Sequence, residues 1–231
     1  MKVLEINSFL EFHQIVENYS GSNYLFRGQT NFEWELIPKI GRPGFARTIP
    51  SVFREDYLLR SWMRYSSHII IREPIDQWDR LSLAQHHGLA TRLLDWTKNP
   101  LVALFFATFD FSSEEDASVF IFDFKNETTQ TERLDPFTIT FSGVFYPKGI
   151  TARVISQRGV FSFSNNPQKS LEVLMPTFDF IKLKINGGAK KSIQKNLEQY
   201  GINEFSIYQD LDNLSNYLNR FVLSKEIDKI I

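Results

Sequence analysis

A short segment of this chain can only be a buried helix, and it limits the fold that surrounds it. Asn99 is a typical helix N-cap, and Pro100 occupies the first helical position. The helix that they begin, over Leu101–Phe106, is apolar on every side, so it must be buried on every side. The apolar run ends at Ala107, far short of the roughly 20 residues that cross a membrane. We therefore expect a helix in the middle of a soluble globular fold, with no membrane partner.

The remaining patterns place helices early, strands later and a helix at the end. Helical periodicity and capping residues predict helices over Ser8–Tyr19, Val52–Ile71, Ile75–His87, Lys190–Tyr200 and from Asp210 onwards. Strands are predicted over Tyr24–Gly28, Thr91–Trp96, Ser118–Phe124, Arg153–Phe163, Phe178–Ile185 and Glu204–Tyr208, with a loop over Pro38–Pro50. This order predicts an α+β fold, with N-terminal helices on a central mixed or antiparallel sheet and a C-terminal helix. Because the chain has no repeat or linker-like stretch, we expect a single domain over residues 1–231.

Composition excludes several classes of function. The 26 Lys and Arg balance 27 Asp and Glu, so a nucleic-acid partner is not expected. The chain has no cysteine, which excludes disulfides, thiolate metal sites and cysteine nucleophiles and fits a reducing cytoplasm. Gly-rich phosphate loops, dinucleotide fingerprints and His-Glu-x-x-His are also missing. We expect one lysine-rich group to be a solvated face rather than a phosphate-binding patch: Lys182, Lys184, Lys190, Lys191 and Lys195.

An arginine inside an apolar strand is the first candidate for a functional residue. A buried guanidinium is costly unless an anion meets it, and its planar fork suits a carboxylate or a phosphate. Gly28 lets a ligand or another backbone approach closely. Arg27, Gly28 and Gln29 are therefore candidate ligand-binding residues. The alternative is a structural salt bridge from Arg27, with Asp95 as the acid.

A helix–turn–strand with a high density of polar groups is the second candidate. Adjacent histidines on a helix point about 100° apart, so His86 and His87 are not expected to share a metal ion. One of them could move a proton at a pocket. We expect His86, Arg92 and Trp96 to bind ligand and His87 and Asp95 to be catalytic. The alternative is that one histidine caps the helix and the other packs in the core.

The third candidate is a strand pattern in which Gln157 and Arg158 precede Gly159. An amide and a cation at this place would suit the rim of a pocket, so both are candidate ligand-binding residues. The alternative is a hairpin or bulge, where a glycine is common.

At these segments the chain resembles the FRG domain family, which is named for its Phe-Arg-Gly motif. The resemblance covers nearly the whole chain, and the sequence departs from it at Ala90 and at Tyr208-Gln209. It implies a bacterial or phage protein without a defined reaction, and it names no cofactor and no protein partner. It rests on Phe26-Arg27-Gly28-Gln29, on Trp34 with Leu36 and Pro38, on Gln85–Gly88 and Asp95–Thr97, on Asn99-Pro100 with Ala103–Ala107, on Gln157–Phe161 and on Ile207–Leu214.

The first functional hypothesis is an enzyme acting on a nucleotide, by analogy with ADP-ribosyltransferases and other NAD-consuming effectors. In those enzymes an arginine on an early strand holds NAD, and a later strand precedes a buried helix. By this analogy Arg27 clamps a phosphate, Trp96 stacks on a ring, and His86 or His87 moves a proton or orients a hydroxyl group. Either Glu204 or Asp95 would stabilise the oxocarbenium-like centre, although no Glu-x-Glu pattern marks the acid.

Two other hypotheses use the same residues without a reaction. A non-catalytic module would bind a phosphate-bearing ligand or a partner through the same pocket. A purely structural network of buried polar groups would only fix the fold. All three hypotheses require that these separated segments meet in space.

Overall fold

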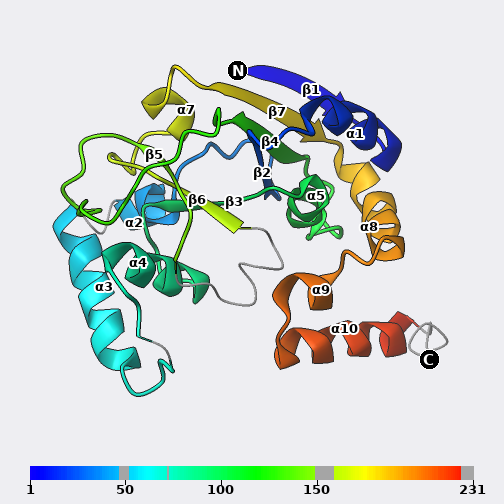
Figure 1. The fold of residues 1–231 in the computed structure, drawn as a ribbon. Coiled ribbons are helices and arrows are strands. Elements are labelled where there is room, and N and C mark those ends of the chain that lie inside the picture. Colours follow the sequence, from blue (N-terminus) through cyan, green and yellow to red (C-terminus); the bar gives the residue numbers. More distant parts are fainter. Residues whose placement is uncertain (47–51, 72, 149–158, 225–231) are drawn as a thin grey trace.

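A seven-stranded mixed sheet forms the centre of the part of the chain that the structure describes (Figure 1). This computed structural model describes residues 1–46, 52–71, 73–148 and 159–224. The strand order is β1-β7-β4-β2-β3-β6-β5. β1 pairs with β7 in parallel, and the other pairs of neighbours are antiparallel. The strands are β1 (Lys2–Ile6), β2 (Tyr24–Gln29), β3 (Leu93–Thr97), β4 (Ala117–Asp123), β5 (Gly143–Phe145), β6 (Gly159–Phe163) and β7 (Asp179–Ile185).

Helices cover the sheet and confirm the α+β class. The α-helices are α1 (Phe9–Val16), α2 (Pro43–Ala46), α3 (Val52–Ser66), α4 (Gln77–His86), α5 (Pro100–Thr108), α7 (Leu171–Leu174), α8 (Lys190–Gln199), α9 (Glu204–Tyr208) and α10 (Leu211–Ser224). Short 3-10 turns are η1 (Glu17–Tyr19), η2 (Lys39–Gly41) and η3 (Gly187–Ala189). None of the helices within the described ranges has the length and apolar character needed to cross a membrane.

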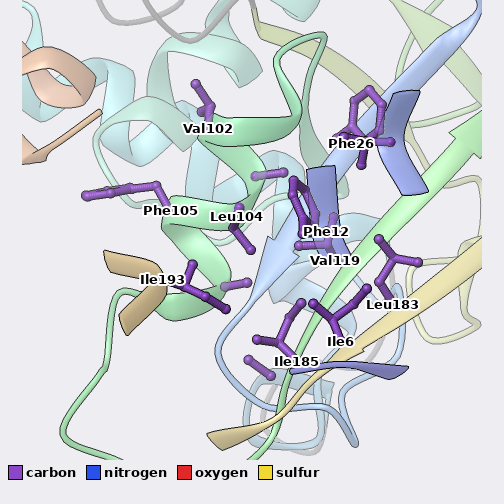
Figure 2. Close-up of a cluster of buried hydrophobic side chains, with 14 of the residues drawn as sticks. Ile6, Phe12, Phe26, Val102, Leu104, Phe105, Val119, Leu183, Ile185 and Ile193 are labelled. Carbon is purple, nitrogen blue, oxygen red and sulfur yellow. The ribbon is translucent and has the colours of Figure 1, made fainter. Parts of the chain in front are cut away.

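The apolar helix α5 lies against the sheet, as its sequence predicts. Asn99 begins it, because its side-chain oxygen accepts a hydrogen bond from the Leu101 N–H at 3.0 Å. Figure 2 shows Leu104 and Phe105 of α5 within a cluster that also holds Phe12 of α1 and Ile193 of α8. Burying a side chain of this size stabilises the fold by about 1.5–3 kcal/mol, so this cluster fixes the position of α5 over β2.

The two faces of the sheet are covered differently. On one face, α1, α5 and α8 cover β2, β4 and β7, whereas α3 and α4 contribute to a separate cluster with β3, β5 and β6. The other face carries one continuous aromatic cluster, with Trp96 and Phe122 in its interior. Figure 1 shows α3 and α4 at the lower left and α5 and α8 on the right. A seam between two sets of helices therefore crosses one face of the sheet.

Several expected boundaries are shifted. The helix expected over Val52–Ile71 ends at Ser66, and the loop expected over Pro38–Pro50 contains η2 and α2. β6 confirms the end of the strand expected over Arg153–Phe163, whose first part lies outside the described residues. The last helix begins after Asp210, whose carboxylate accepts the N–H of Asn213 at 2.7 Å.

The strand expected over Glu204–Tyr208 is wrong, because this segment is the helix α9. The side chain of Asn203 accepts the N–H of Ser206 at 3.0 Å, and the Ser206 hydroxyl accepts the N–H of Asn203 at 3.0 Å. This reciprocal capping box begins a helix. Gln209, with a left-handed φ of 52°, ends it.

The solvated lysine face is also wrong at two positions. Lys182 is 7% exposed, with its ammonium 4.4 Å from the ring centre of Phe32 and 4.9 Å from that of Phe120. Lys190 is fully buried and donates to the carbonyl oxygens of Thr30, Asp110 and Ser113 at 3.4–3.5 Å. Both ammonium groups are stabilised inside the fold by rings or carbonyl oxygens, which no local pattern reveals.

Candidate functional site

A split in the sheet, between β2 and β3, creates the candidate site. β4 pairs with every residue of β2, and β6 pairs with every residue of β3. Between β2 and β3 themselves only Phe26 and Thr97 are in register. A longer ladder would continue along β2 through Arg27 and Gly28, and along β3 through Trp96 and Asp95. These residues line a pocket instead.

The pocket has a volume of about 290 Å³, near the lower end of the range for small-molecule sites. Its lining combines the two strands with the apolar side chains Val102, Ala103 and Phe106 of α5. The end of α4, the beginning of β6 and the segment that follows β2 complete the lining. The pocket thus lies on the seam between the two sets of helices, where segments distant in sequence meet.

Arg27 spans the split between the strands. Its Nη1 donates a hydrogen bond to the backbone oxygen of Asp95 at 2.6 Å and lies 3.5 Å from the Asp95 carboxylate. The side chain is 14% exposed. Its Nε is buried without a hydrogen-bond partner among the described residues. The guanidinium therefore replaces part of the missing backbone ladder, with its hydrogen-bonding capacity incompletely used.

Burial lowers the pKa of Arg27 below its ordinary value, because desolvation disfavours the charged guanidinium. The Asp95 carboxylate opposes this shift, and the neighbouring Arg42 adds to it. Burial also lowers the pKa of Arg42, again against the influence of Asp95. Two guanidinium groups thus share this pocket with the carboxylate of Asp95, so an additional anion would stabilise their charged forms.

Arg42 reaches the pocket from the segment between η2 and α2. Its Nε donates to the Ile37 backbone oxygen at 3.3 Å, and its guanidinium carbon lies 5.5 Å from the ring centre of Trp34. Trp34 also lines the pocket and is 46% exposed. The segment is held close by the Ile40 N–H, which donates to the Thr91 oxygen at 3.3 Å. A charged group and a wide aromatic surface therefore stand together at the pocket.

Asp95 is held by a short polar chain that begins in α4. Gln85 donates through Nε2 to the Asp95 carboxylate at 3.0 Å, and the Thr91 hydroxyl donates to the Gln85 side-chain oxygen. His86 lines the same pocket one residue further along α4. The site thus also holds an imidazole and a carboxylate, the groups that commonly transfer protons.

The structure gives Gly28 a packing role. A Cβ on Gly28 would lie 1.9 Å from the Ala103 carbonyl oxygen and 2.6 Å from the Ala107 nitrogen. Glycine at this position is therefore required for α5 to approach β2. Gly28 also lines the pocket, beside Gln29, whose Oε1 is buried without a hydrogen-bond partner in the described part of the chain.

Six of the residues that the sequence singles out meet at this pocket, although Trp96 does so as a core residue. The Trp96 ring is buried and its Nε1 donates to the Ser162 hydroxyl at 2.8 Å. Its position leaves it unsuited to stacking on a ligand, in contrast with the exposed Trp34. The six residues are Arg27, Gly28, Gln29, His86, Asp95 and Trp96.

Three predicted site residues lie elsewhere. Arg92 is buried in an ion pair with Glu55, with 2.8 Å between its Nε and the carboxylate. Glu204 pairs with Arg220 at 3.0 Å. His87 is the C-cap residue of α4, exposed beside Trp62. The pocket is lined by none of the three.

The predicted rim residues Gln157 and Arg158 lie outside the described residues. Gly159, Val160 and Phe161, which follow them, do line the pocket. Among the side chains that the structure describes, no group of three or more His, Asp or Glu is arranged to hold a metal ion.

Arg42, Trp34 and Gln85 line the pocket but are not among the predicted site residues. Gln85 stands inside the polar helix–turn–strand, so its position was a usable signal. Arg42 lies among Gly41, Pro43 and Gly44, in a segment that the sequence shows only as a loop. Its place in the site depends on long-range packing that has no local pattern.

The model of the FRG domain matches residues 22–116. The matched range contains β2, α4, β3 and α5, and with them both guanidinium groups and the carboxylate of the pocket. No curated protein and no solved structure matches the chain.

Proposed function

Because this chain carries an FRG domain, we propose that the pocket of this domain binds a phosphate-bearing small molecule of the nucleotide class. The observation that carries the proposal is the presence of two guanidinium groups, from Arg27 and Arg42, at a single pocket. The guanidinium of Arg27 is largely buried and that of Arg42 is partly buried. A buried arginine interacts more strongly with a phosphate than an arginine at an exposed surface does.

The remaining lining supports a ligand with a ring as well as a phosphate. The half-buried Phe106 offers an apolar surface, and Trp34 presents an exposed indole next to Arg42. An aromatic base can pack on such surfaces while its phosphates reach the arginines. This combination favours a nucleotide over a free inorganic anion.

A second candidate function is catalytic: an ADP-ribosyltransferase-like or other NAD-consuming reaction. The observation that favours it is the position of Asp95 and His86 beside the two arginines. Since Glu204 is paired with Arg220 outside the pocket, the acid of this reaction would be Asp95. The non-catalytic module requires only the arginines and the apolar surfaces.

We further propose that a single domain extends over residues 1–231. β4, β6 and β7 lie beyond residues 22–116, yet they pair with β2, β3 or each other in the same sheet. We also propose a cytoplasmic location, which the absence of cysteine supports, because disulfides are rare in a reducing cytoplasm.

Isothermal titration with ADP, NAD, ADP-ribose and inorganic pyrophosphate tests the binding function. Arg42→Gln should weaken binding at least about tenfold, the scale of one lost charge-assisted hydrogen bond. The matched control is Arg60→Gln on α3, which removes an exposed arginine that pairs with Asp56 at 2.7 Å. This control should bind as the unaltered protein does. Absence of binding by every ligand at millimolar concentration would contradict the proposal.

Product analysis after incubation with the same ligands distinguishes the two candidate functions. Consumption of NAD that stops in Asp95→Asn, while this variant still binds the ligand, would support the enzyme. Binding without any product would support the non-catalytic module.

A further inference from the structure

A negatively charged side chain lies in a pocket whose two arginines attract anions. Asp95 is the carboxylate among the pocket-lining residues of the described chain, and its side chain is 59% exposed. It belongs to β3, while the two arginines come from β2 and from the segment before α2. A ligand phosphate near Arg27 would meet this carboxylate and be repelled by it.

The contact between Arg27 and the Asp95 carboxylate is long. The 3.5 Å from Nη1 to Oδ2 exceeds the roughly 2.7–3.2 Å of a good N–H···O hydrogen bond. The short hydrogen bond from this nitrogen goes to the Asp95 backbone oxygen, at 2.6 Å. The carboxylate can therefore leave the neighbourhood of the guanidinium while the bridge across the split remains.

Gln85 holds the carboxylate in this intermediate position. Its Nε2 lies 3.0 Å from the same Oδ2, and its own oxygen is fixed by the Thr91 hydroxyl. The amide thus provides a competing donor on the side of α4. Gln85 acts as a positioning residue, because it limits how closely Asp95 approaches Arg27.

We propose that Asp95 competes with ligand anions for Arg27. Its carboxylate stays close to the Arg27 guanidinium until a more highly charged ligand displaces it. This inference rests on the proposed function, since it concerns the ligand of the same pocket. A singly charged group gains little by replacing one carboxylate. A pyrophosphate group gains more, because it carries further charge for Arg42. Asp95 would thereby select ligands of the diphosphate class over monoanions.

Titration of inorganic pyrophosphate into two variants and a control tests this inference. Asp95→Asn keeps the shape of the side chain and removes the charge, so it should bind pyrophosphate roughly tenfold more tightly. Gln85→Met removes the competing donor and lets the carboxylate approach Arg27, so it should bind more weakly. Asp56→Asn changes the net charge equally on α3, where Asp56 pairs with Arg60, and should bind as the unaltered protein does.

The outcomes separate the inference from the proposed function. If the unaltered protein binds pyrophosphate and Asp95→Asn binds it equally or more weakly with an unchanged melting temperature, Asp95 is not a competitor and the binding function stands. If Asp56→Asn tightens binding as much as Asp95→Asn, the effect is one of net charge and the inference is wrong. If neither the unaltered protein nor Asp95→Asn binds pyrophosphate or any nucleotide, both proposals fail.

Discussion

At the scale of single residues, Gly28 is a position where a small change should be strongly destabilising. A methyl group there would overlap with the backbone of α5 at Ala103, and a backbone segment yields less readily than a flexible side chain. Gly28→Ala should therefore lower the free energy of unfolding by about 1–3 kcal/mol or more. Denaturant unfolding measures this directly.

Gly44→Ala is the matched control for this prediction. Nothing lies within 4 Å of a Cβ built on Gly44, which is part of α2. Its substitution should leave stability unchanged or raise it by up to about 1 kcal/mol. Equal stability of Gly28→Ala and Gly44→Ala would show that α5 is not held against β2 in the way described.

Individual residues also show where sequence reasoning stops. The sequence predicts a polar role for Arg27, because an arginine in an apolar strand needs an anionic or polar partner, and its partner is Asp95. The alternation of Lys182 with Ile181 and Leu183 is typical of a half-solvated strand, and it wrongly predicts that Lys182 is exposed. Its ammonium is covered by Phe32, which is about 150 residues away along the chain.

At the scale of elements, Asp116 connects the start of β4 to the turn η3. Its carboxylate accepts the Gly187 N–H at 2.9 Å and pairs with Lys184 at 3.1 Å. The hydrogen bond from Gly187, together with Lys184, lowers the pKa of Asp116 below its ordinary value. Its contribution to stability is therefore present above the unfolded pKa of about 4 and is lost as the pH falls through the lower folded pKa.

Asp116→Asn tests this link between elements. The variant should have a lower urea midpoint than the unaltered protein at pH 7, and the difference should shrink as the pH falls below the unfolded pKa of about 4. Ser67 offers a control, since its hydroxyl donates to the backbone oxygen of Arg64 at 3.0 Å, a group that does not titrate. Ser67→Ala should give a difference that does not depend on pH. A constant difference for Asp116→Asn would mean that the carboxylate charge is not involved.

The elements were predictable wherever caps and periodicity agreed. Asn99 and Pro100 marked the start of α5, and Gly201 with φ +72° follows the end of α8. The segment Glu204–Tyr208 failed because five residues of mixed polarity fit either period, and the deciding hydrogen bonds come from Asn203 and Ser206. The secondary structure of a short segment depends more on the capping residues that flank it than on its own composition.

At the scale of the whole molecule, the matched range cannot complete its own sheet. Residues 22–116 contain β2 and β3, which share a single registered pair, and they end just before β4. Expressed alone, residues 22–116 should show no cooperative unfolding, whereas the full chain should unfold in one transition. Circular dichroism during thermal or urea unfolding measures both. A cooperative transition of the short segment would contradict the single-domain proposal.

The split between β2 and β3 leaves two halves of the sheet whose strands share one registered pair. The bridge from Arg27 to the Asp95 backbone oxygen and the aromatic cluster on the other face also connect the halves. Each half has its own covering helices, α1, α5 and α8 on one and α3 and α4 on the other. Bending should concentrate along this line, because it is crossed by the fewest backbone hydrogen bonds. A molecule bound in this pocket would contact both halves of the sheet. Its binding would therefore change or fix the angle between the two outer strands, β1 and β5.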